Sequence, residues 1–283
     1  MAKRTKKNPS RRSSSTSTNS QDEFVVTKEY RRFAEFCDAC RRHRYIGLCY
    51  GPPGVGKTLS GRQYAKWDYL EPYLDITFRD PEDRPPIDFN ECRAVFYTPT
   101  VANTPRQIES RVESIFMRFN CAIDEVLAPK LPDVLVMREW VELLIVDEAD
   151  RLKFAGLEQI RDVYDRAKMG LVLVGMPGIE KRLARYPQLY SRVGFVHRFK
   201  VLSTKEMRFI LQKKWETVGR ILDQNDFTDE ETVSAILRIT GGNFRLLDRL
   251  LAQVERVLQI NELQTVTKEV VEAARESLVI GAA

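Results

Sequence analysis

The stretch that decides the fold is Gly-Pro-Pro-Gly-Val-Gly-Lys-Thr at residues 51–58, directly after the apolar run Tyr-Ile-Gly-Leu-Cys-Tyr at 45–50. An apolar run that leads into a glycine-rich loop ending in Gly-Lys-Thr predicts a strand, a loop that wraps phosphate groups, and a helix that begins at the loop. The glycines let backbone amides turn inward on a di- or triphosphate, Lys57 reaches the outer phosphates, and the Thr58 hydroxyl can hold Mg²⁺. The expected nucleotide contacts are the whole loop and the residue after it, namely Gly51, Pro52, Pro53, Gly54, Val55, Gly56, Lys57, Thr58 and Leu59.

A second motif supplies two acids at the end of another apolar run. Residues 143–150 read Leu-Leu-Ile-Val-Asp-Glu-Ala-Asp. Next to a phosphate loop, Asp147 is expected to hold Mg²⁺ through its water shell, and Glu148 to orient and polarise the attacking water. Alone, the segment would indicate an acidic turn after a buried strand; together with the loop, it predicts nucleotide hydrolysis.

The order of apolar segments predicts an α/β fold followed by a helical domain. Short apolar runs at 94–97, 143–146, 171–174 and 195–199 alternate with helical or turn segments, which is typical of a parallel sheet covered by helices. Helical patterns are expected at 27–44 and 104–126, and the proline-containing stretch 68–92 is expected to be irregular. Beyond residue 202 the strand pattern stops, and Ser203 with Glu206 forms a capping box that opens a helix. We therefore expect a tail over 1–26, a nucleotide-binding α/β domain over 27–201 and a small helical lid domain over 202–283.

Charge is concentrated at the amino terminus. Residues 1–21 hold six of the 45 lysines and arginines and none of the 40 acidic residues, so the rest of the chain is close to neutral despite the net charge of +5. A basic tail rich in Ser, Thr and Asn is expected to be disordered, and either to attract nucleic acid weakly or only to aid solubility. With no signal-peptide pattern, no membrane-length apolar run and five cysteines, we expect an intracellular protein with reduced thiols.

Two arginines are candidates for completing the catalytic site, because charge develops on the transferring phosphoryl group. Arg245, in Gly-Gly-Asn-Phe-Arg at 241–245, opens a helix of the carboxyl-terminal domain and could reach the nucleotide as part of a lid. Arg192, just before the last strand, could reach the nucleotide of a neighbouring subunit. Each of them could instead be a solvated or ion-paired side chain.

The phosphate loop, the Val-Asp-Glu-Ala-Asp-Arg-Leu run at 146–152, Leu-Val-Leu-Val-Gly at 171–175 and the Gly-Gly-Asn-Phe-Arg motif together resemble an AAA+ ATPase. The resemblance is to the TniB/TnsC/MuB group of transposition regulators, with IstB helper ATPases more distant. It implies an ATP- and Mg²⁺-dependent homo-oligomer, a ring or a filament, that is associated with the nucleoid in the cytoplasm. Such an oligomer would bind duplex DNA, recruit or stimulate a transposase together with target-selection proteins, and disassemble on hydrolysis.

Within the resemblance, Arg192 corresponds to a finger acting on the neighbouring subunit and Arg245 to a second sensor. Met176 stands where many AAA+ proteins have a polar first sensor, which implies slow turnover or another residue in that role.

DNA contacts in the related ATPases come from the segment after the second strand. The resemblance places them here at Thr98, Thr100, Arg106 and Arg111; the alternative is that the arginines form only a solvated helix face.

Two other functions remain open. One is an AAA+ replication initiator or helicase loader. The other is a nucleotide-dependent protein remodeller or signalling ATPase without DNA binding, which the lack of an aromatic-glycine pair at 98–106 disfavours.

Overall fold

The computed structural model describes residues 24–76, 85, 87–127, 139–217, 227–263 and 265–278, without the side chains of 215–217 and 227–229. The predicted basic tail at 1–21 lies outside the described residues. Within the described residues, no helix is long and apolar enough to cross a membrane.

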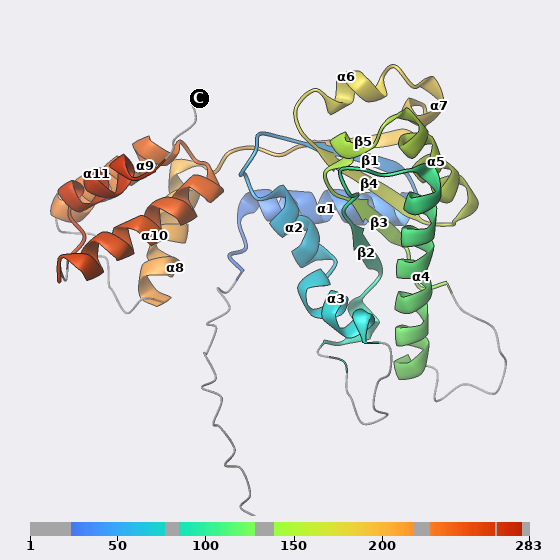
Figure 1. Cartoon of the computed structure of the whole chain (residues 1–283), viewed down its shortest axis with the longest axis horizontal. Coiled ribbons are helices and arrows are strands. Elements are labelled where there is room, and N and C mark those ends of the chain that lie inside the picture. Colours follow the sequence, from blue (N-terminus) through green and yellow to red (C-terminus); the bar gives the residue numbers. More distant parts are fainter. Residues whose placement is uncertain are drawn as a thin grey trace, which may run out of the picture.

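The centre of the molecule is a five-stranded parallel sheet in the order β2-β3-β4-β1-β5 (Figure 1). Its strands are β1 Ile46–Tyr50, β2 Ala94–Tyr97, β3 Leu143–Val146, β4 Gly170–Gly175 and β5 Val193–Arg198. β3 and β4 are buried along their whole length, which explains why they are continuous apolar runs, whereas the edge strand β5 alternates between partly buried and exposed residues. The predicted parallel α/β fold is confirmed.

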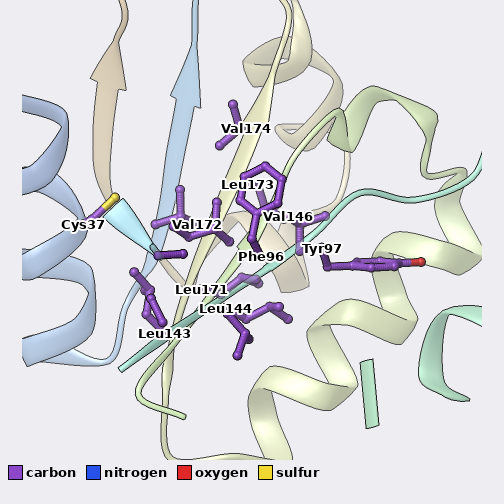
Figure 2. Close-up of a cluster of buried hydrophobic side chains, with 14 of the residues drawn as sticks. Cys37, Phe96, Tyr97, Leu143, Leu144, Val146, Leu171, Val172, Leu173 and Val174 are labelled. Atoms are coloured by element: carbon purple, nitrogen blue, oxygen red, sulfur yellow. The ribbon is translucent and has the colours of Figure 1, made fainter. Parts of the chain in front are cut away.

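Helices surround this sheet, and most of them contribute buried apolar side chains to its core. They are α1 Lys28–His43, α2 Lys57–Tyr64, α3 Trp67–Asp75, α4 Pro105–Leu127, α5 Phe154–Arg166, α6 Ile179–Leu183 and α7 Pro187–Tyr190, with short 3-10 turns at η1 Phe89–Glu91 and η2 Ala149–Arg151. α1 begins where the Thr27 side chain accepts a hydrogen bond from the Tyr30 amide, and it buries Phe33, Phe36 and Cys37 against β1, β4 and β5. Figure 2 shows the resulting core, in which Cys37 and Phe96 lie beside the apolar side chains of β3 and β4.

The expectation of an irregular segment at 68–92 is wrong for its first part. α3 occupies Trp67–Asp75 with Pro72 inside it, after the chain turns through the left-handed residue Lys66. A proline inside a helix costs about 3 kcal/mol. The helix forms nevertheless because it buries four large apolar side chains, each worth about 1.5–3 kcal/mol: Trp67, Leu70, Tyr73 and Leu74.

The last four helices, α8 Thr204–Thr217, α9 Phe227–Thr240, α10 Phe244–Ile260 and α11 Lys268–Glu276, form a separate helical body beside the sheet (Figure 1). They enclose an apolar cluster of their own, against which Val25 from the segment before α1 also packs. The predicted capping box is present, since Glu206 accepts hydrogen bonds from the Ser203 amide and hydroxyl. Glu206 also accepts one from the Lys28 amide, 3.1 Å away, and so joins the helical body to the start of α1.

Candidate nucleotide site

The loop at 51–56 connects the end of β1 to the start of α2, as the sequence predicts. Gly54 and Gly56 have φ angles of 76° and 99°, which residues with a side chain rarely adopt. Gly51 has a different constraint, because a Cβ there would lie 2.4 Å from the Phe199 carbonyl oxygen. Gly56 precedes α2 without a side-chain cap, so the first amides of that helix remain available to an anion.

Lys57 is the first residue of α2, and its side chain turns back onto this loop. Its Nζ donates to the carbonyl oxygens of Gly51 and Pro52, at 2.6 and 2.7 Å. Desolvation by the surrounding protein lowers the pKa of Lys57. The ammonium group is thus held at the loop in position to meet a phosphate.

Thr58 and Asp147 are brought together by the order of the strands. The Thr58 hydroxyl donates to Asp147 Oδ2 at 2.7 Å, and the Asp147 amide donates to the Tyr97 carbonyl at 2.9 Å. Asp147 is only 3% exposed, and desolvation raises the pKa of its carboxyl, against the hydrogen bond from Thr58. A hydroxyl and a carboxylate side by side are the oxygen donors that Mg²⁺ prefers, so these two residues fit a magnesium ion.

Glu148 follows Asp147 in a left-handed backbone conformation, with φ at 47°. Its carboxylate pairs with Arg151 at 2.5 Å. Arg151 also donates to the Pro99 carbonyl at 2.9 Å, in the segment after β2. The candidate hydrolytic acid is therefore linked through one arginine to the segment that the resemblance assigns to DNA.

Met176, which follows β4 where a polar first sensor was expected, contacts both the acidic loop and Lys57. The Met176 amide donates to Asp150 Oδ2 at 2.6 Å, and the Met176 sulfur lies 3.9 Å from Lys57 Nζ. Asp150 thereby ties the acidic loop to the end of β4. Asp150 was not predicted as a site residue, although its position in the Asp-Glu-Ala-Asp run at 147–150 was a usable signal.

The structure places the two candidate arginines differently. Arg192 makes a bidentate pair with Asp165 of its own chain, at 2.8 and 3.1 Å, and it donates to the Gln188 carbonyl. Arg245 is exposed at the start of α10, and its positive charge adds to the effect of desolvation in lowering the pKa of Lys57. The structure therefore brings Arg245 toward the phosphate loop, and Arg192 faces its own α5.

The four residues expected at DNA all lie at the surface after β2. Thr98, Thr100 and Arg106 are exposed, and so is Arg111 on the first turns of α4. Among the described residues, Arg106 has no hydrogen bond or ion pair. Asn103 orders the segment by donating to the carbonyls of Thr100 and Arg151, at 2.6 and 3.4 Å.

The parallel sheet, the phosphate loop after β1 and the acid pair after β3 define a P-loop nucleotide hydrolase. The profile of the AAA domain family matches residues 40–183, and the chain belongs to this family of ATPases.

Two relatives agree with this assignment. A Staphylococcus aureus "Potential ATP-binding protein" is 45% identical over 270 residues, covering 91% of this chain and 97% of the relative. The Mu-like prophage FluMu DNA transposition protein B of Haemophilus influenzae is 34% identical over 238 residues, covering 81% of this chain and 71% of that protein. The resemblance to the TniB/TnsC/MuB group is thereby confirmed.

Solved structures share the fold. A RuvB variant of Thermotoga maritima has a TM-score of 0.58 at 17% identity, over 91% of this chain and 71% of that one. The Aeropyrum pernix ORC2 protein has a TM-score of 0.57 at 17% identity, over 90% of this chain and 70% of that one. At this identity the likeness concerns the fold alone.

Proposed function

We propose that this AAA ATPase is an ATP-dependent, DNA-binding oligomeric regulator of DNA transposition, which marks target DNA and recruits or activates a transposase. The observation that carries the proposal is the 34% identity to a DNA transposition protein B across 71% of that protein, in a chain with a complete phosphate loop and acid pair. Hydrolysis would return the oligomer to free subunits.

In this proposal each residue of the site has a chemical role. The amides of the loop and Lys57 bind the phosphates of ATP, while Thr58 and Asp147 hold Mg²⁺. The metal would supply positive charge where the phosphates carry negative charge. Glu148 accepts a proton from the attacking water, through the carboxylate oxygen that is not paired with Arg151 or after that pair has opened.

The two arginines act from different sides. Arg245 extends from the lid toward its own nucleotide, where a cation stabilises the charge on the transferring phosphoryl group. Arg192 would act on the nucleotide of a neighbouring copy. It is held by Asp165 in the single chain, so it has to exchange that partner on assembly or be oriented by it.

DNA binding is assigned to the exposed residues Thr98, Thr100, Arg106 and Arg111. Arg106 supports this best, because it is exposed and unpaired among the described residues at the start of α4. Arginine and hydroxyl contacts of this kind reach the phosphate backbone, which gives affinity for duplex DNA without reading its sequence.

The proposal has a direct test in electron microscopy of the purified protein with ATP, with and without duplex DNA. We expect rings or filaments only when both are present, and none with Lys57→Ala, which loses the ammonium that meets the phosphates. Wild-type protein that binds ATP and yet shows neither assembly nor DNA binding would overturn the proposal. A transposase gene next to this one would support the transposition role, and replication genes in its place would favour a helicase loader.

A further inference from the structure

The lid domain touches the phosphate loop through Asn243, the N-cap of α10, and through Arg245 in the first turn of that helix. The Asn243 side chain donates from Nδ2 to the Pro53 carbonyl oxygen at 3.0 Å. The Arg245 amide donates to the Gly54 carbonyl oxygen at 3.0 Å. Two successive carbonyls of the loop are therefore hydrogen-bonded to the lid, across 190 residues of sequence in the case of Asn243.

These bonds fix the direction of the amides on the other side of the same peptide groups. No peptide bond in the described chain is cis, and in a planar trans peptide the C=O and the following N–H point in opposite directions. Holding the carbonyls of Pro53 and Gly54 toward the lid thus turns the amides of Gly54 and Val55 away from it, into the loop. Successive amides turned to one side form an anion-binding concavity, and a hydrogen bond to each carbonyl polarises its peptide group and makes the amide a better donor.

The chain is shaped to permit this contact. A Cβ on Gly54 would lie 2.4 Å from Asn243 Oδ1 and 3.0 Å from the Arg245 Cβ, so it would push the Asn243 side chain away, and the φ angle of 76° also favours glycine. On the lid side, Gly241 and Gly242 have positive φ angles of 54° and 80°, and they turn the chain sharply into α10. Asn243 Oδ1 meanwhile caps α10 by accepting from the Leu246 amide at 3.2 Å.

From this geometry we propose that Asn243 is a positioning residue of the phosphate site: the lid, through Asn243 and the start of α10, presets the Gly54 and Val55 amides for the phosphates of the nucleotide. The contact works in both directions. Phosphate bound to these amides holds the same peptide groups that hold the lid, so nucleotide binding and lid position stabilise each other. The inference rests on the nucleotide-binding part of the proposed function and is independent of DNA and of transposition.

The test uses Asn243→Ser in the full-length protein, with Asn243→Ala beside it. Serine is a good helix cap, so this variant retains the cap of α10, but its side chain is too short to reach the Pro53 carbonyl. We expect both variants to bind ATP about three- to tenfold more weakly by calorimetry, as loss of one hydrogen bond predicts. The nucleotide-free variants should also take up deuterium faster in the peptide that contains residues 51–58.

The serine variant separates the two roles of the asparagine. If Asn243 only caps the helix, Asn243→Ser will bind ATP and exchange deuterium like the wild type, and only Asn243→Ala will differ; that result would overturn the inference. Lys57→Ala serves as the control for loss of nucleotide binding. Failure of the wild-type protein to bind ATP would instead refute the proposed function, so the two failures are distinguishable.

Discussion

Replacing Glu148 by glutamine removes the carboxylate that is proposed to activate water and changes little else. Glutamine has nearly the same shape, and the ion pair that it would weaken is exposed, with 33% and 50% of the Arg151 and Glu148 side chains accessible. A pair of this kind contributes about 0–1 kcal/mol to the free energy of unfolding. We therefore expect the melting temperature to shift by less than about 4 °C.

The effect on hydrolysis should be much larger. General-base catalysis accelerates a reaction by about 10²–10⁴-fold, which corresponds to about 3–5 kcal/mol in the activation free energy. ATP affinity should be retained, because the proposed phosphate contacts come from residues 51–58 and from the lid rather than from Glu148. Assemblies that form on DNA with ATP should consequently persist, whereas those of the wild type are expected to disassemble as the ATP is hydrolysed.

The measurements are phosphate release for turnover, calorimetry for ATP affinity and thermal unfolding for stability. Glu230→Gln is the matched control, because Glu230 is also paired with an arginine, Arg208 at 2.9 Å, but the pair joins α8 to α9 within the helical body. Undiminished phosphate release by Glu148→Gln would refute the role assigned to Glu148. An equal loss in the control would show that the assay reports a general effect of removing a charge.

Three further predictions concern the loop, the DNA segment and pH. Gly54→Ala should weaken ATP binding and destabilise the protein by about 1 kcal/mol or more. Gly178→Ala is the control, because Gly178 also has a positive φ, 105°, but has open space around it, so this variant should retain ATP affinity. Equal ATP binding by both variants would contradict the close lid contact. Arg106→Ala should weaken ATP-dependent binding of duplex DNA equally for all sequences, and should reduce by about 1 the slope of log binding constant against log salt concentration. Arg31→Ala, at another exposed arginine, is the control and should change neither quantity. Unchanged affinity of Arg106→Ala would remove the assignment. Desolvation lowers the pKa of His197, although the Glu29 carboxylate 3.2 Å away acts to raise it. As the pH drops below about 6.5, the histidine therefore binds a proton more readily in the unfolded state than in the folded state. The free energy of unfolding in urea should therefore fall as the pH drops below about 6.5, and should fall less for a His197→Gln variant; identical pH profiles would refute this.

The sequence predicted the elements that carry the site, because their signals are local. Residues 45–58 encode a strand, a loop and a helix start within 14 positions, and Ser203 with Glu206 encodes a helix start within four. Local signals also failed once. The prolines of 68–92 predicted irregular structure, but the buried apolar face of α3 outweighed Pro72.

The sequence by itself determined the phosphate loop, the acid pair and the alternation of strands and helices, since glycine conformation, hydrogen-bonding chemistry and side-chain periodicity act over a few residues. Only the tertiary structure decided which distant groups meet. The order β2-β3-β4-β1-β5 brings Thr58 within hydrogen-bonding distance of Asp147. The turn into α10 likewise lets the Asn243 side chain donate to the Pro53 carbonyl. Arg192 is paired with Asp165 for the same reason. The way in which whole elements pack to bury their apolar faces determines these partners. That packing depends on the complete chain, so no short stretch of sequence specifies it.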